Sequence, residues 1–132
     1  MKKVLLFLML SISIIGCEKQ RQDDSNYNLI GEWTWISSCG GFYYHCITPE
    51  SSNHYIKVTF TADSIYNVYQ DGIRIQSEKF HTRVFPPSNM PGTANVLKYG
   101  QNIITYFNIT HDTLTLNDSY ADGFISLYKR TK

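Results

Sequence analysis

Apolar and polar residues alternate along most of the chain beyond residue 29, and this alternation constrains the fold more than any other feature. In His54–Thr61, for example, Ile56, Val58 and Phe60 share one face of an extended segment, because successive strand side chains point to opposite faces. No window from 31 to 132 keeps a helical apolar period over three turns. The region is also rich in Tyr, Ile, Thr, Val and Phe, which suit a half-buried pleated surface. The pattern predicts an all-β domain.

Turn signals divide this region into eight predicted strands. Asp71-Gly72 is typical of a hairpin turn with positive φ, and prolines in segment 86–92 interrupt the pattern because proline donates no ladder hydrogen bond. Thr48–Asn53 is the one candidate for a helical turn. The expected strands are Gly31–Ser37, His54–Thr61, Ile65–Gln70, Ile73–Val84, Ala94–Tyr99, Asn102–Ile109, Thr113–Asn117 and Gly123–Arg130. Such consecutive antiparallel hairpins close best as an up-and-down barrel, with a two-sheet sandwich as the main alternative.

The first residues of the chain do not follow this pattern. Val4–Ile15 is a largely apolar run after two lysines, but it is shorter than the about 20 residues that a membrane span needs. It has the form of a secretory signal. Ile14-Ile15-Gly16-Cys17 then resembles the lipobox of bacterial lipoproteins. The resemblance implies that Met1–Gly16 is removed and that Cys17 carries the lipid that holds the protein on a membrane.

Residues 17–28 predict a flexible tether. Glu18–Asn28 is rich in charged and amide residues and has no aliphatic one, so it cannot bury enough apolar surface to offset the entropy of ordering. Position 18 is not the aspartate associated with inner-membrane retention in enteric bacteria. An outer-membrane location is therefore favoured, on the periplasmic face or at the cell surface, with residues 29–132 as the domain on the tether.

Charge and cysteines narrow the function classes. Removing Lys2 and Lys3 from 12 basic residues leaves 10 against 11 acidic ones, and this near-neutral balance argues against nucleic acid as a partner. With Cys17 lipidated, Cys39 and Cys46 form a pair across a Gly-Gly turn, which indicates a disulfide outside the cytoplasm. The rival interpretation makes Cys39, His45 and Cys46 metal ligands, but a fourth ligand is not evident. We expect no metal and no cofactor.

A family resemblance spans roughly residues 29 to 131. Leu29-Ile30-Gly31-Glu32-Trp33 resembles the Gly-x-Trp motif that opens the first strand of lipocalin-like barrels. The ordered set that follows is similar to that of small lipocalin-like lipoproteins of Bacteroidetes, with calycin-like barrels. It comprises the Gly-Gly loop with Thr48-Pro49-Glu50, the turn Phe60-x-x-Asp63, the hairpin Tyr69-x-x-Gly72 and the closing Leu127-Tyr128-Lys129-Arg130. The resemblance implies that Arg130 packs on Trp33 and closes one end of the barrel, which is a structural role.

The sequence leaves two binding functions open. The preferred one is non-enzymatic binding of a small hydrophobic molecule or glycan in the barrel mouth, which needs an open cavity of about 300 Å³ or more. The alternative is a protein-interaction or inhibitor module, such as a lysozyme or protease inhibitor, that uses the Gly40–Cys46 loop. Phe42, Tyr43 and Tyr44 would then form an exposed contact patch, because aromatic residues are favoured at interfaces. We expect a monomer and no catalytic residue, since no nucleophile motif or selected carboxylate pair is present.

Overall fold

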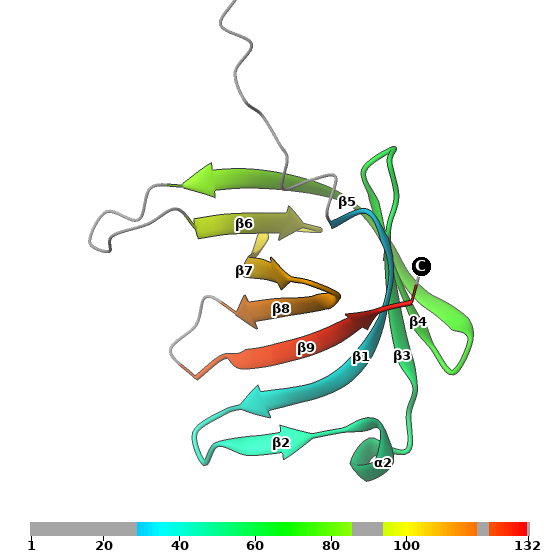
Figure 1. Cartoon of the computed structure of the whole chain (residues 1–132), viewed down its shortest axis with the longest axis vertical. Coiled ribbons are helices and arrows are strands. Elements are labelled where there is room, and N and C mark those ends of the chain that lie inside the picture. The colour runs from blue at the N-terminus through cyan, green and yellow to red at the C-terminus, as the bar shows by residue number, and fades with distance from the viewer. Residues whose placement is uncertain (1–28, 86–93, 119–121, 132) are drawn as a thin grey trace, which may run out of the picture.

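The fold is a closed antiparallel β-barrel, seen in a computed structural model that describes residues 29–85, 94–118 and 122–131 (Figure 1). Its strands are β1 (Gly31–Gly40), β2 (His45–Ile47), β3 (Ile56–Phe60), β4 (Ile65–Gln70), β5 (Ile73–Phe85), β6 (Ala94–Tyr99), β7 (Ile103–Thr110), β8 (Thr113–Asp118) and β9 (Phe124–Arg130). Pairing of β1 with β9 closes the sheet. The predicted up-and-down barrel of eight strands is confirmed. The predicted signal, lipidation site and tether lie outside the described residues.

β2 is an addition to the eight barrel strands. It pairs only with the end of β1 and lies at the edge of the sheet order. In Figure 1, β2 and helix α2 (Pro49–Ser52) lie at the bottom of the view, below β1. The hydroxyl of Thr48 caps α2 by accepting a hydrogen bond from the Ser51 amide at 3.3 Å, which confirms the predicted helical turn. Among the described residues, no helix has the length and apolarity to cross a membrane.

β5 is the longest strand, and it links β3 and β4 to the strands that follow because its two halves pair with different strands. Its first half pairs with β4, and its second half, from Phe80 onward, pairs with β6. The β4–β5 register shifts where Val68 faces Gln76 but Tyr69 faces Arg74. Such an irregularity bends a strand and increases its twist. Figure 1 shows the result, with β3 and β4 on the right and β5 running across the top.

Large side chains from most strands fill the barrel interior. Trp33, Phe60, Leu97 and Leu114 have almost no exposed surface, and the ring of Phe60 meets that of Phe80 edge to face with centroids 5.2 Å apart. The residues that the alternation places on one face are the ones that pack together, because antiparallel partners share a face of the sheet. Their burial removes apolar surface from water, which is the main favourable contribution to folding.

Candidate binding surface

The β1–β2 hairpin carries the three most exposed aromatic side chains of the described residues. Gly40 pairs with His45, and the amide of Tyr44 closes the turn on the Gly41 carbonyl oxygen at 3.0 Å. Phe42, Tyr43 and Tyr44 are 81%, 91% and 73% exposed. The rings of Phe42 and Tyr43 meet edge to face with centroids 5.1 Å apart. We call these three residues the aromatic tip.

Two features hold the base of this hairpin in place. A disulfide joins Cys39 to Cys46, which are directly opposite residues of β1 and β2 with Cα atoms 4.1 Å apart. On its other edge, β1 pairs with β9, where Gly40 faces Phe124. A Cβ atom at Gly40 would lie 2.8 Å from the Phe124 Cα and still closer to the Gly123 carbonyl oxygen. Only glycine therefore allows this approach.

The disulfide settles the alternative that the sequence left open for these cysteines. Because both sulfur atoms are bonded to each other, Cys39 and Cys46 are not metal ligands, and the predicted disulfide is confirmed. Within residues 29–85, 94–118 and 122–131, no group of three or more His, Cys, Asp or Glu side chains could hold a metal ion. His45 is exposed on β2 beside the aromatic tip.

Trp33 and Arg130 meet near the N-terminal end of β1. They are cross-strand partners of β1 and β9, and the guanidinium carbon lies 4.0 Å from the ring centroid of Trp33. The indole Nε1 donates a hydrogen bond to the Leu29 carbonyl oxygen at 2.8 Å, and Arg130 Nη1 donates to the Ile30 carbonyl oxygen at 3.1 Å. Together Leu29 and Arg130 cover a fully buried indole.

A group of polar side chains interrupts the apolar interior. Glu78 of β5 faces Tyr66 of β4 on the inner side of the sheet. Its Oε2 atom is buried without a hydrogen-bond partner among the described residues, and the buried Thr105 hydroxyl on β7 lies beside the Tyr99 hydroxyl. Burial, followed by the nearby Tyr128, Tyr99 and Glu78, raises the pKa of Tyr66 far above the ordinary value of tyrosine. Such an unpaired buried polar atom calls for an explanation, since it costs free energy.

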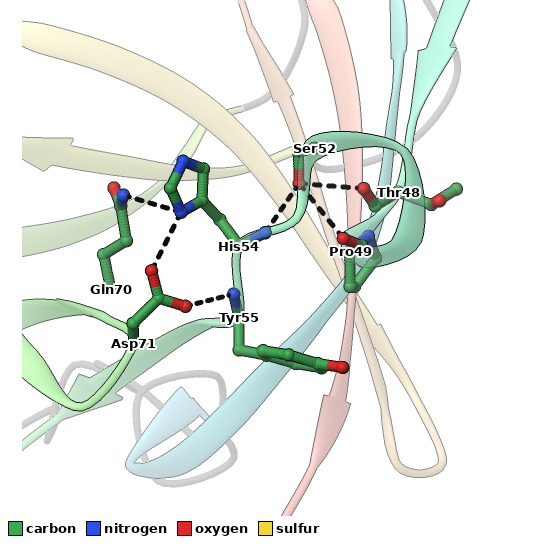
Figure 2. Close-up of polar contacts among 7 residues, drawn as sticks. All are labelled: Thr48, Pro49, Ser52, His54, Tyr55, Gln70 and Asp71. Atoms are coloured by element: carbon green, nitrogen blue, oxygen red, sulfur yellow. Dashed lines mark hydrogen bonds and ion pairs between the residues drawn. The ribbon is translucent and has the colours of Figure 1, made fainter.

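A second polar cluster fastens the segment before β3 to the β4–β5 turn (Figure 2). Asp71 accepts hydrogen bonds from the Tyr55 amide and from His54 Nδ1, both at 2.8 Å. Gln70 Nε2 lies 3.1 Å from the same His54 nitrogen. The Tyr55 amide and then His54 lower the pKa of Asp71. Because Ser52 contacts the backbone of His54 and not its ring (Figure 2), this cluster fixes loops and forms no Ser-His-Asp relay.

The structure therefore gathers the predicted site residues in two places. The two cysteines and the aromatic tip belong to one hairpin, whereas Trp33 and Arg130 lie at the beginning of β1 and the end of β9. Glu78 and Thr105 were not among the site residues predicted from the sequence. The one sequence signal for Glu78 is the alternation of β5, which places this residue on the same face as the buried Phe80.

Comparison with protein-family models, with curated proteins and with solved structures found no match. The closed eight-stranded barrel is compatible with the lipocalin-like fold that the motifs predict. Membership of the lipocalin-like lipoproteins stays a prediction from those motifs.

Proposed function

We propose that this protein is a non-enzymatic binding module of the bacterial cell envelope that holds a partner protein through its aromatic tip. The observation that carries the proposal is the exposure of three consecutive aromatic side chains, Phe42, Tyr43 and Tyr44, on a disulfide-braced hairpin. Such side chains supply large contact area with few rotatable bonds. They are also the residue types that concentrate binding energy at interfaces.

The shape of the hairpin favours a macromolecular partner. Small ligands bind in concave sites, whereas the aromatic tip is a β-turn whose three side chains are each more than two-thirds exposed. Such a turn fits into a cleft of another protein. Because the disulfide and the pairing with β9 hold the base of the turn, little conformational entropy is lost on binding.

Charge favours a protein over a membrane as the partner of this tip. Residues 38–47 contain no lysine and no arginine, so the hairpin lacks the cations that attract anionic lipid headgroups. Two of the three aromatic residues are tyrosines, whose hydroxyl groups can hydrogen-bond to a polar protein surface. The inhibitor function proposed from the sequence is one form of this binding.

The lipid anchor completes the proposal. Acylation at Cys17 and the tether of residues 17–28 would keep the barrel close to the outer membrane, where its partner would be an envelope protein. In cells of the native host, Cys17→Ser should abolish labelling by radioactive palmitate and move the protein from the membrane to the soluble fraction. Unchanged labelling of the Cys17→Ser variant would contradict the anchor, independently of any result on the aromatic tip.

Site-specific photocrosslinking tests the contact site itself. A benzoyl-phenylalanine at position 43, in the native host, should give one discrete protein adduct. The matched control places the same group at Lys129, which is also exposed but lies on β9 of the barrel wall. Adducts of equal yield from both positions, or adducts with lipid only from position 43, would contradict the proposal.

A buried polar atom favours a second candidate function, the binding of a small molecule inside the barrel. Glu78 Oε2 lacks a partner among the described residues, and a ligand with a hydrogen-bond donor would satisfy it. Mass measurement of the intact protein purified from its host tests this candidate. A small molecule that co-purifies with the wild type, and is lost in Glu78→Gln, supports it; a wild-type protein of bare mass contradicts it.

A further inference from the structure

A groove on the outer wall of the barrel lies away from the aromatic tip. It has a volume of about 290 Å³ and is lined by His81, Arg83, Val96, Lys98 and Ile104. The strand registers explain how these residues meet. His81 of β5 faces Lys98 of β6, which faces Ile104 of β7, and Arg83 faces Val96 in the next row. The groove is therefore built on three adjacent strands and does not depend on a loop.

The polar part of the groove is entirely cationic or basic. The side chains of His81, Arg83 and Lys98 take part in none of the side-chain hydrogen bonds and ion pairs of the described residues, and no carboxylate lines the groove. Lys79 occupies the preceding outward position of β5. The whole chain is almost neutral, so this concentration of positive charge is local. It creates a field that attracts an anion.

The floor of the groove is apolar. Val96 is only 7% exposed although it belongs to the outward-facing row, and Ile104 is 42% exposed. Tyr106 on β7 faces Val96 and extends the apolar surface beyond the lining residues. A ligand in this groove therefore meets positive charge and aliphatic surface side by side.

We propose that this groove binds a single-chain amphiphile with an oxyanion head, either phosphate or carboxylate. Arg83 and Lys98 hold the head, since guanidinium and ammonium groups form strong charge-assisted hydrogen bonds to such oxygens. Val96 and Ile104 contact the start of the apolar chain. The volume lies at the lower limit of small-molecule sites, which suits one short chain and not a complete phospholipid. The site is independent of the aromatic tip and of its partner.

Amide NMR titration of the purified mature protein tests this site with defined probes. Octyl phosphate and octanoate present the two oxyanion heads, inorganic phosphate lacks the chain, and octyl glucoside lacks the charge. We expect at least one charged amphiphile to give saturable shifts centred on residues 81–83 and 96–104, with affinity about tenfold or more above that of inorganic phosphate. Octyl glucoside should leave these amides unshifted.

Variants test whether the oxyanion head binds at the cationic residues of the groove and the apolar chain at its aliphatic residues. Arg83→Gln with Lys98→Gln should weaken binding of the charged amphiphile about tenfold or more, whereas Lys129→Gln, an exposed cation on β9, should change it less than about twofold. Ile104→Ser should weaken the amphiphile but not inorganic phosphate. Equal binding of octyl glucoside, equal effects of Lys129→Gln, or shifts confined to the barrel interior would overturn the proposal.

Discussion

At the scale of single residues, two side chains with opposite exposure depend on specific polar neighbours. Trp33 is fully buried and is held by the Leu29 carbonyl oxygen and the Arg130 guanidinium. Asp71 is exposed, yet it accepts hydrogen bonds from the Tyr55 amide and from His54. Trp33 stabilises the barrel through packing of its indole, and Asp71 does so through the hydrogen bonds that its carboxylate accepts.

Replacement of Trp33 by alanine should damage the fold. We expect Trp33→Ala to lower the free energy of unfolding by about 3–5 kcal/mol, because it leaves a cavity where a buried indole packed. Arg130→Lys should cost less, about 1 kcal/mol, since lysine keeps the charge but loses the planar group over the ring. Urea unfolding measures both, with the more exposed Ile36→Ala as the control. An unchanged free energy of unfolding in Trp33→Ala would contradict this role.

Asp71 should make stability depend on acid pH. Its pKa is lowered in the folded state, so its contribution is complete above the ordinary pKa of aspartate, about 3.9. That contribution is lost as the pH falls through the lowered folded value, because the unfolded chain takes up the proton first. Chemical unfolding measured between neutral pH and pH 2 should give a weaker acid dependence for Asp71→Asn than for the wild type.

A matched variant distinguishes the contribution of Asp71 to the acid dependence of stability from that of Glu50, the other carboxylate of this region with a lowered pKa. The pKa of Glu50 is also lowered, first by its own backbone amide and then by Thr48. Glu50→Gln should therefore also weaken the dependence of stability on acid pH. In the variant that carries both substitutions the two reductions should add, since effects at independent sites are additive. An Asp71→Asn profile identical to that of the wild type would contradict the role of this carboxylate.

At the scale of elements, the alternation predicted the barrel strands but not the hairpin extension. The predicted first strand ends at Ser37, whereas β1 continues to Gly40 and is followed by β2. Its continuation rests on a backbone approach between Gly40 and Phe124, a contact distant in sequence that no local pattern reports. The two cysteines on either side of the Gly-Gly turn still predicted the disulfide, and the structure places them directly opposite each other on β1 and β2, where its geometry is satisfied.

The disulfide should stabilise this hairpin measurably. Replacing Cys39 and Cys46 together by serine should lower the free energy of unfolding by about 2 kcal/mol, at the low end of the usual range because the closed loop is short. Urea unfolding of the double variant, beside the reduced and oxidised wild type, measures the difference. Equal stability of the double variant and the oxidised protein would show that pairing with β9 alone fixes the hairpin.

Strand register explains why the groove and the polar interior escaped prediction. Lys98 lies opposite His81 because β6 pairs with β5 in one specific register. No local sequence pattern indicates that register across the connection of residues 86–93. The same holds for Glu78, which reaches the interior at the point where β5 faces Tyr66. Periodicity tells which residues share a face of one strand, but the register decides which strands bring their residues together.

At the scale of the whole molecule, two buried tyrosines, Tyr66 and Tyr128, and the partly buried Tyr99 should couple the stability of the barrel to alkaline pH. Burial is the largest cause that raises the pKa of Tyr66, Tyr99 and Tyr128. Above about pH 10, the ordinary pKa of tyrosine, the unfolded chain loses these protons while the folded barrel keeps them. Stability should therefore fall as the pH rises above that value.

Absorbance titration near 295 nm, combined with circular dichroism, measures this coupling. At least two of the ten tyrosines, Tyr66 and Tyr128, should ionise only as the barrel unfolds, and Tyr66→Phe should reduce that number by one. Tyr43→Phe is the matched control, because Tyr43 is exposed at the aromatic tip. Ionisation of all tyrosines before any loss of β structure would contradict the enclosed arrangement.

The whole molecule thus presents separate surfaces on one closed barrel, with the aromatic tip at the end of β1 and the cationic groove on the outer wall of β5–β7. The proposed tether would leave both surfaces accessible to envelope components. A disulfide holds the base of the tip, and disulfides persist mainly in oxidising compartments, which agrees with the proposed location in the cell envelope.

Native mass spectrometry of the protein isolated from its host shows whether the aromatic tip holds a protein partner. The wild type should retain a protein partner in stoichiometric amount, and a triple variant, Phe42→Ser with Tyr43→Ser and Tyr44→Ser, should lose it while keeping the wild-type melting temperature. A wild type that carries no protein partner, or a triple variant that retains the same partner in full, would contradict the account.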